Sequence, residues 1–279
     1  MSYIQNRLLP DQSPGIVGIL NITPDSFYDG GEYNEVEEAV SRATAMVDCG
    51  VDAIDVGGES TRPGAKEVSN EEEISRVVPV IRGIREAELT IPISIDTSSA
   101  RVARQALEAG ADIVNDVTAL RNDAGMGEVI AEFDVPVVLM HMQGTPRTMQ
   151  DNPQYDDVIV DLIEFFRDRV EEALTNGIRE EQIIMDPGIG FGKTQEHNRE
   201  IFKKIDRFEK LGLPVMMGHS RKSFLEPITG KPARDRLSAT LAVSSYLYEC
   251  GVDFIRVHDV PEHVDAYRTL DWIHGRGES

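Results

Sequence analysis

A short local pattern recurs along the chain and constrains the fold more than any other feature. In each copy, the end of an amphipathic helical stretch is followed by a glycine and then by a short apolar run. The clearest copies are residues 47–54, 107–114 and 248–255, which read VDCGVDAI, LEAGADIV and YECGVDFI. Glycine suits the left-handed position that ends a helix, so each copy predicts a helix that leads into a strand. The apolar runs are continuous rather than alternating, which is typical of parallel strands covered on both faces.

Repeated helix–strand units account for most of the chain. Amphipathic helical stretches, for example residues 35–47, 100–109, 157–174 and 233–248, separate eight apolar runs. Because no break in composition divides these units, we expect an α/β fold, a single (β/α)8 TIM barrel. A doubly wound open sheet would need a glycine-rich phosphate turn after the first strand, and none is present. The predicted strands are residues 16–22, 53–56, 93–95, 113–115, 137–140, 183–185, 215–217 and 254–257.

The chain is expected to form one barrel domain rather than two smaller domains. It spans residues 1–279, with the barrel at about 15–275 behind a short polar N-terminal extension. No apolar run is long enough for a transmembrane helix, and the N-terminus lacks the pattern of a secretory signal. We therefore expect a cytoplasmic protein with no membrane partner. Cys49 and Cys250 are interpreted as small buried residues in a reducing compartment, with a disulfide between them as a minor alternative.

The charge of the chain is strongly negative. Its 49 acidic and 28 basic residues give a formal net charge of −21. Such a surface repels phosphate backbones, so no nucleic-acid partner is expected. The acidic residues are spread over helical faces and most basic residues are arginines. Two interpretations stay open, an ordinary solvated surface and an adaptation to high salt.

Polar side chains occupy the carboxyl end of every predicted strand. In a (β/α)8 barrel these ends meet on one face, where the active sites of such folds lie. One polar strand end could be a helix cap or a structural hydrogen bond, but eight on one rim favour a site. The eight residues are Asn21, Glu59, Asp96, Asn115, His141, Asp186, His219 and His258.

Three of these side chains, Asp96, Asn115 and Asp186, could read the donor and acceptor edge of a flat heterocycle. Each carboxylate alone could equally cap the following helix, because residues 97–98 and 187–188 have the composition of helix starts. Together the three favour a binding site, since burying them without a ligand would be costly.

Positive charge gathers near the ends of the last two strands, at Lys222, Arg256 and His258. That sector of a barrel often binds phosphate, and arginine offers it a planar fork of donors. In so acidic a chain, these residues favour an anionic ligand over surface ion pairs.

Loops and near-motifs complete the pattern. Residues 23–31 and 57–65 are rich in glycine and proline and are expected to form binding walls rather than plain linkers. Residues 188–194 resemble a phosphate-binding loop, but a proline stands where its first glycine is required. No paired cysteines or zinc-binding histidine motif occur, so no structural zinc is expected. His197, His263 and His274 lie in polar helical stretches and are expected on the surface.

Taken in order, the strand ends and loops resemble the dihydropteroate synthase family, and the matches cover almost the whole chain. The resemblance implies a transferase of folate biosynthesis that joins 6-hydroxymethyl-7,8-dihydropterin diphosphate to p-aminobenzoate and releases pyrophosphate. The matching stretches are GILNITPDSF (18–27), DVGGESTRPG (55–64), SIDT (94–97), NDV (115–117), HMQGTP (141–146), DPGIGFGK (186–193), SRKS (220–223) and RVHDV (256–260).

The resemblance also implies roles for individual residues. The pterin would be held by Asp96, Asn115, Asp186 and Lys222, with Met140 and Val117 as apolar walls. Arg256 and His258 would sit on the phosphates with Thr61 near them, and Asn21 would bind Mg²⁺ together with the pyrophosphate. Arg62 and Val257 would be further substrate-binding residues. The p-aminobenzoate would be bound by Phe27, Pro63, Phe191 and Ser223. The catalytic set would be Asp96, Lys222, Arg256 and His258.

The family resemblance carries expectations about partners and leaves alternatives. Homodimers are usual in the family, and residues 239–248 are small and apolar enough to permit one. Sulfonamides are expected to compete with p-aminobenzoate. The main alternative is a pterin-binding methyltransferase that uses methyltetrahydrofolate, which has no need of the diphosphate residues. An inactive barrel should show gaps among the polar strand ends, and a fused folate enzyme should have more residues outside the barrel.

Overall fold

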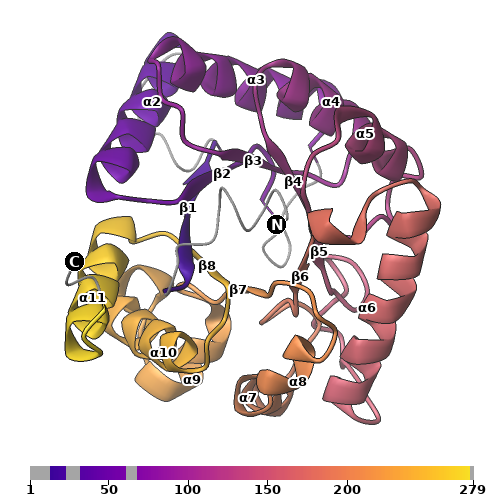
Figure 1. Ribbon diagram of the computed structural model, residues 1–279, viewed down its shortest axis with the longest axis vertical. Coiled ribbons are helices and arrows are strands. Elements are labelled where there is room, and N and C mark those ends of the chain that lie inside the picture. The colour runs from indigo at the N-terminus through magenta and orange to yellow at the C-terminus, as the bar shows by residue number, and fades with distance from the viewer. Residues whose placement is uncertain (1–12, 23–31, 61–67, 277–279) are drawn as a thin grey trace.

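Eight short parallel strands form the centre of the molecule, as the computed structural model shows for residues 13–22, 32–60 and 68–276. They pair in the order β6-β5-β4-β3-β2-β1-β8-β7, and a bridge between Met185 and Val215 joins the two ends into a ring. Figure 1 looks down this ring. The predicted TIM barrel is confirmed. The strands are β1 (Gly15–Asn21), β2 (Ala53–Gly57), β3 (Ile93–Asp96), β4 (Ile113–Asp116), β5 (Val137–Met140), β6 (Ile183–Asp186), β7 (Met216–Gly218) and β8 (Phe254–Val257).

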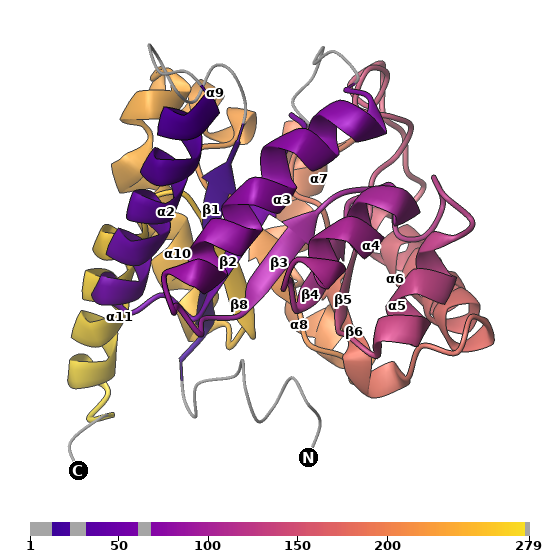
Figure 2. The same ribbon diagram turned by 90° about the horizontal axis from the view of Figure 1, so that it is seen from above.

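Helices surround the ring and connect successive strands (Figure 1). Figure 2 shows α2, α11 and α10 lying side by side along one flank of the barrel. The long helices are α2 (Glu32–Cys49), α3 (Asn70–Glu86), α4 (Ala100–Glu108), α5 (Met126–Phe133), α6 (Val158–Thr175), α7 (Gln195–Lys203), α10 (Leu237–Glu249) and α11 (Val260–Ile273). Two single-turn helices, α8 (Asp206–Glu209) and α9 (Glu226–Thr229), and the 3-10 turns η2 (Glu180–Gln182), η3 (Ser223–Leu225) and η4 (Ala233–Asp235) complete the connections.

Side chains along each strand alternate between two cores, because successive residues of a strand point to opposite faces. The outward set, such as Leu20, Ile54 and Leu139, is fully buried under the helices. The inward set closes the bottom of the barrel with one apolar layer. That layer is Val17, Ala53, Ile113, Val138, Ile184, Met216 and Phe254.

The next inward position lies two residues further along each strand, and polar and charged side chains appear there. Asp55 follows Ala53, Asn115 follows Ile113, and Arg256 follows Phe254. A packed apolar layer below and a polar layer above explain how a buried barrel carries charged groups at its C-terminal rim. The period of two therefore selects which residues form the site.

Some surface expectations from the sequence are wrong. His263 is completely buried in α11, where its Nδ1 donates to the Asp259 carbonyl, because this side of the helix packs into the protein, where α11 contacts α10 and β1. Cys49 and Cys250 are free thiols and half-buried rather than fully buried. The helix predicted at 233–248 begins later, at Leu237, because Ala233–Asp235 forms a 3-10 turn. Within the part of the chain that the structure describes, no helix has the length and apolarity to cross a bilayer.

Candidate active site

The predicted polar rim exists as expected. Asn21, Asp96 and Asp186 are the last residues of β1, β3 and β6, and Asn115 is the penultimate residue of β4. Glu59, His141, His219 and His258 lie just beyond their strands. All parallel strands end on the same face, so these eight residues share one end of the barrel.

A charged cluster fills the rim between β2, β3, β4 and β8. The Arg256 guanidinium donates from Nε to Asp55 Oδ2 at 2.6 Å and from Nη2 to Asp96 Oδ2 at 2.7 Å. Asn115 Nδ2 donates to the same Asp55 oxygen at 3.2 Å. Asp55 is 1 % exposed, so one buried carboxylate orients two neighbouring side chains, Arg256 and Asn115.

The cluster holds more acid than base, and this shifts its ionisation. Burial raises the pKa of Asp96 to about 7 against the opposing charge of Arg256, while Asp55 and Glu73 add smaller increases. Desolvation would lower the pKa of Arg256, but the two carboxylates outweigh it and raise that pKa, so the guanidinium stays charged. One oxygen each of Asp55 and Asp96 is buried with no hydrogen-bond partner among the described residues. Such oxygens favour a ligand or a bound water that brings N–H or O–H donors.

Across the barrel, Asp186 and Lys222 flank Gly218 at the end of β7. A Cβ added to Gly218 would lie 3.4 Å from Asp186 Oδ2 and 3.6 Å from Lys222 Nζ. Asp186 Oδ1 accepts from the Gly188 amide at 2.7 Å, and Lys222 Nζ donates to the Ile189 carbonyl at 2.6 Å. Desolvation lowers the pKa of Lys222 to about 8, and burial raises the pKa of Asp186. A hydrogen-bond acceptor, Asp186, and a donor, Lys222, thus lie side by side next to Gly218.

Asp96 and Asp186 are not the N-caps of the helices that follow them. The N-cap of α4 is Ser99, whose hydroxyl accepts from the Val102 amide, so Asp96 caps no helix. Asp186 holds the turn at Gly188 with one oxygen, but α7 is capped by Thr194. Both aspartates therefore stand at the rim without capping the helix that follows.

An apolar group borders the charged residues. Met140, the last residue of β5, packs with Val117, Met142 and Met149, and Phe191 lies against this group. The Lys222 ammonium sits 4.3 Å from the centre of the Phe191 ring. Methionine side chains and an aromatic ring next to paired donors and acceptors suit the faces of a flat ring system.

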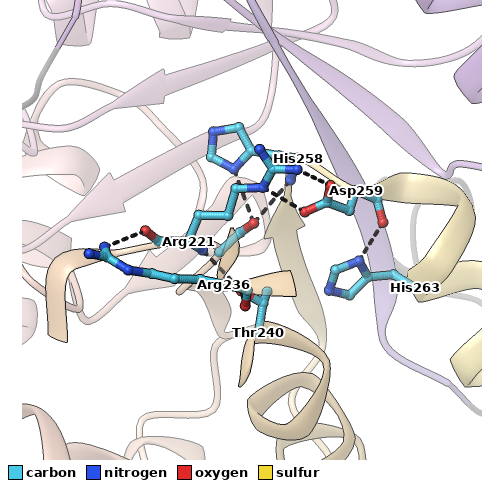
Figure 3. Close-up of polar contacts among 7 residues, drawn as sticks. Arg221, Arg236, Thr240, His258, Asp259 and His263 are labelled. Carbon is cyan, nitrogen blue, oxygen red and sulfur yellow. Dashed lines mark hydrogen bonds and ion pairs between the residues drawn. The ribbon is translucent and has the colours of Figure 1, made fainter. Parts of the chain in front are cut away.

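The turn between β7 and η3 is fixed to β8 by a second polar network, shown in Figure 3. Arg221 pairs with Asp259 through two guanidinium nitrogens: Nε donates to Asp259 Oδ2 at 2.8 Å, and Nη2 donates to Asp259 Oδ1. Arg236 Nη1 donates to the carbonyls of Arg221 at 3.0 Å and Lys222 at 3.1 Å. Arg221 has a left-handed φ of 56°, and the Thr240 hydroxyl accepts from its amide. The backbone on either side of Lys222 is therefore held from two directions.

His258 is held by Ser220. The Ser220 hydroxyl accepts from the His258 amide at 3.2 Å and lies 3.0 Å from its Nδ1. If the hydroxyl hydrogen points to Nδ1, the neutral ring carries its proton on Nε2, which is the tautomer that can donate to an anion.

Other predicted residues have different surroundings. His219 is fully buried, with Nε2 2.7 Å from the Ser244 hydroxyl, and His141 is buried against Phe165, so both rings pack into the structure. Val257 points outward into the core under the helices, which leaves only its backbone at the rim. Ser223 is exposed at the start of η3. Thr61, Arg62, Pro63 and Phe27 lie outside the described residues.

Two further residues of the rim had no predicted role. Asp55 lies inside a short apolar strand, where a carboxylate is so unusual that it could have been recognised from the sequence. Lys193 belongs to the segment that resembled a phosphate-binding loop. Its side chain is buried, with Nζ 2.9 Å from His141 Nδ1.

The fold and the rim define the class of protein: a (β/α)8-barrel enzyme with a buried, charged site at the C-terminal strand ends. A family model described as pterin binding enzyme matches residues 17–258. A dihydropteroate synthase of Clostridium beijerinckii is 45% identical over 92% of this chain and 93% of its own length. The chain therefore belongs to the pterin-binding enzyme family and, within it, to the dihydropteroate synthases.

Solved structures agree with this assignment. A Yersinia pestis dihydropteroate synthase in complex with a sulfonamide drug has a TM-score of 0.89 and 40% identity over 94% of this chain and 95% of that chain. The Xanthomonas albilineans enzyme in complex with 7,8-dihydropteroate has a TM-score of 0.86 and 36% identity over 98% of both chains. These relatives are synthases, which disfavours the methyltransferase alternative.

Proposed function

We propose that this protein condenses 6-hydroxymethyl-7,8-dihydropterin diphosphate with p-aminobenzoate to give 7,8-dihydropteroate and pyrophosphate. The observation that carries the proposal is the arrangement of Asp96, Asn115, Asp186 and Lys222 around the apolar group at Met140. Hydrogen-bond donors and acceptors around the edge of a flat ring, with apolar side chains against the faces of that ring, suit a pterin. The activity of the family supplies the reaction.

The pterin end of the site is proposed to be read by Asp186, Lys222 and Asn115. Asp186 would accept the ring and exocyclic N–H groups, and Lys222 would donate to a ring acceptor on the other side of Gly218. Met140 and Val117 would cover one face of the ring. Asp96 would accept from a further ring N–H through its buried oxygen.

The diphosphate end is proposed to lie against Arg256 and His258. Arg256 stays charged and His258 Nε2 can donate, so both can bind phosphate oxygens. Thr61, Arg62 and the Val257 backbone would add contacts at this end. Phe27, Pro63, Phe191 and Ser223 would surround the p-aminobenzoate, with the Lys222 ammonium between the two substrates.

Asn21 is proposed to hold Mg²⁺ together with the diphosphate. Its amide lies at the rim close to Asp96, since a Cβ on Gly57 would be 3.6 Å from Asn21 Oδ1 and 3.7 Å from Asp96 Oδ2. Among the described residues there is no group of three carboxylates, histidines or cysteines placed to bind a metal. One amide oxygen with substrate phosphates fits Mg²⁺, which prefers oxygen ligands and is often held mainly by phosphate. When bound, the ion would neutralise charge on the departing pyrophosphate.

The reaction is proposed to begin with cleavage of the C–O bond between the pterin methylene and the diphosphate. The bonding electrons leave with pyrophosphate, whose charge Arg256 and His258 stabilise. The carboxylates of Asp96 and Asp186 offset the positive charge that spreads into the pterin ring. The p-aminobenzoate nitrogen then forms the new C–N bond and releases one proton. No protein nucleophile is needed.

The assembly and setting of the protein follow from the same proposal. We propose a single barrel domain that forms a homodimer through the late helices, near residues 239–248, and works in the cytoplasm. Sulfonamides are proposed to compete with p-aminobenzoate, as the drug complex of the Yersinia enzyme supports.

The test is turnover of the purified protein with both substrates, with and without Mg²⁺, while dihydropteroate and pyrophosphate are measured together. We expect the two products in equal amounts, and only when Mg²⁺ and p-aminobenzoate are both present. Pterin binding without either product, at low and high salt, would refute the proposed reaction.

A further inference from the structure

The loop after β6 is held at four consecutive carbonyl groups, three of them by side chains from other segments and one by Lys193 of the loop itself. Lys222 donates to Ile189 O at 2.6 Å and Gln150 to Gly190 O at 2.6 Å. Lys193 donates to Phe191 O at 3.0 Å and Tyr155 to Gly192 O at 2.7 Å. These four hydrogen bonds fix the backbone of the loop, and Phe191 is the large side chain that the loop presents to the site.

Lys193 differs from the other three donors because it is a buried amine. Its side chain is 3 % exposed, and its only polar contacts among the described residues are the Phe191 carbonyl and His141 Nδ1 at 2.9 Å. No carboxylate within that part of the chain forms an ion pair with it. His141 is 6 % exposed and packs its ring edge against Phe165.

This arrangement is a poor way to stabilise a fold. Burial lowers the pKa of Lys193 well below its ordinary value, and burial together with Lys193 lowers the pKa of His141 to about 2. Hiding an amine with so few partners costs free energy, and an unbranched apolar side chain of similar length would avoid the cost. Stability alone therefore gives no reason for a lysine at this position.

Its contact with Phe191 gives a reason. The Phe191 carbonyl is held by Lys193 on one side, while its ring faces the Lys222 ammonium at 4.3 Å on the other. His141 accepts from the Lys193 amine at Nδ1, which directs the remaining N–H toward the carbonyl. A displaced Phe191 would move the aromatic face that the loop presents to the site, while Lys222 keeps its separate hydrogen bond to the Ile189 carbonyl.

We propose that Lys193 and His141 are positioning residues for the aromatic amine substrate: the buried amine, oriented by the imidazole, fixes the Phe191 backbone so that its ring forms one side of the p-aminobenzoate site. This rests on the proposed function, because Phe191 is assigned to p-aminobenzoate there. The pterin contacts of Asp96 and Asn115 lie on β3 and β4 and do not depend on this pair.

The first test is Lys193→Met, compared with Lys203→Met, which makes the same substitution at an exposed lysine of α7. We expect Lys193→Met to keep or raise the melting temperature. Its KM for p-aminobenzoate should rise by about five- to tenfold, the size of one lost hydrogen bond. The KM for the pterin diphosphate should stay within about twofold, a change too small to reflect a lost contact. Lys203→Met should match the wild type in all three.

A second pair of variants keeps the test decisive if Lys193→Met does not fold. His141→Asn retains an acceptor near the position of Nδ1, and His141→Leu removes it. We expect p-aminobenzoate binding to be close to wild type in the first and weakened in the second. Equal losses for both substrates, or unchanged p-aminobenzoate binding in folded His141→Leu, would overturn the inference. A wild type without turnover would instead refute the proposed function.

Discussion

The buried carboxylates at the rim outnumber the positive charge that could neutralise them. Arg256 is shared by Asp55 and Asp96, and Glu73 lies close enough to raise the pKa of Asp96 further. Glu73 itself is 3 % exposed, and burial raises its pKa to about 7. Such a site is stable when its acids carry protons and is strained when they ionise without a ligand.

This excess of acid predicts how stability depends on pH. The pKa of Asp96 is about 7 in the folded protein and near 4 when unfolded, so the folded state binds more protons between these values. Stability should therefore fall as pH rises from about 4 to about 7, by at most about 1.4 kcal/mol per pH unit for each such group. Asp96→Asn should flatten this dependence, hold or raise the melting temperature at alkaline pH, and lower kcat by about a hundredfold.

The matched control is Glu73→Gln. Its carboxyl has a similarly raised pKa and lies on α3 beneath Gly58, close enough to influence Asp96 but outside the set of proposed pterin contacts. It should also flatten the stability profile while turnover is kept. Melting temperatures and kcat measured across this pH range check both variants. An Asp96→Asn enzyme with full turnover would remove that carboxylate from the mechanism.

Residues at strand ends were predictable because chain position alone places them on the rim. Asp96, Asn115 and Asp186 follow apolar runs directly, and parallel strands bring such positions together. Asp55 was missed because the run around it was interpreted as uniformly buried, and only the alternation of inward and outward positions shows that it faces the site. His263 was assigned to the surface from local polarity, but helix packing decides burial.

At the scale of elements, the sequence located each strand to within one or two residues because glycine and polar residues bound the apolar runs. The start of α10 was less predictable, because contacts with residues distant in the sequence hold the junction between η4 and α10. Arg236, at that junction, is 4 % exposed and donates to backbone carbonyls of the preceding turn. No local pattern encodes such contacts.

The loop after β6 yields a prediction about its packing. Gly188 has a φ of 68°, and a Cβ there would stand 1.9 Å from the His141 carbonyl oxygen. Gly212 has a φ of 73° with nothing within 4 Å of that position. Gly212→Ala should therefore cost only the left-handed conformation, about 1–2 kcal/mol. Gly188→Ala should cost considerably more and impair turnover, since the loop must separate from residues 141–143.

Urea unfolding of the two alanine variants measures this difference. Both lose the same glycine flexibility, so the excess cost in Gly188→Ala reports the close approach of the two loops. Similar unfolding free energies for the two variants would mean that the loops can move apart freely, which would contradict a rigid position for Phe191.

For the whole molecule, the repeated helix–strand units predicted the barrel. The effect of the net charge on stability, by contrast, arises from all surface charges together and not from any single contact. A net charge of −21 on 279 residues makes the surface repel itself at low salt. Several of the described ion pairs are exposed arginine–carboxylate pairs, such as Arg101 with Glu71 and Arg104 with Glu132. Exposed pairs of this kind add little stability, so they cannot offset the general repulsion.

We therefore expect KCl to stabilise the protein. Screening shortens the reach of charge from about 10 Å at 0.1 M to about 3 Å at 1 M, so most of the repulsion should disappear over this range. An ordinary acidic surface predicts a melting temperature that rises and then levels off below about 1 M KCl, where screening is complete. A surface adapted to high salt predicts a further rise, and higher turnover, in molar KCl. Sucrose at matched osmolality is the control, because it stabilises compact proteins without screening charge. A melting temperature that is flat or falls with KCl would show that the acidic residues are already balanced locally, and both interpretations of the surface would fail.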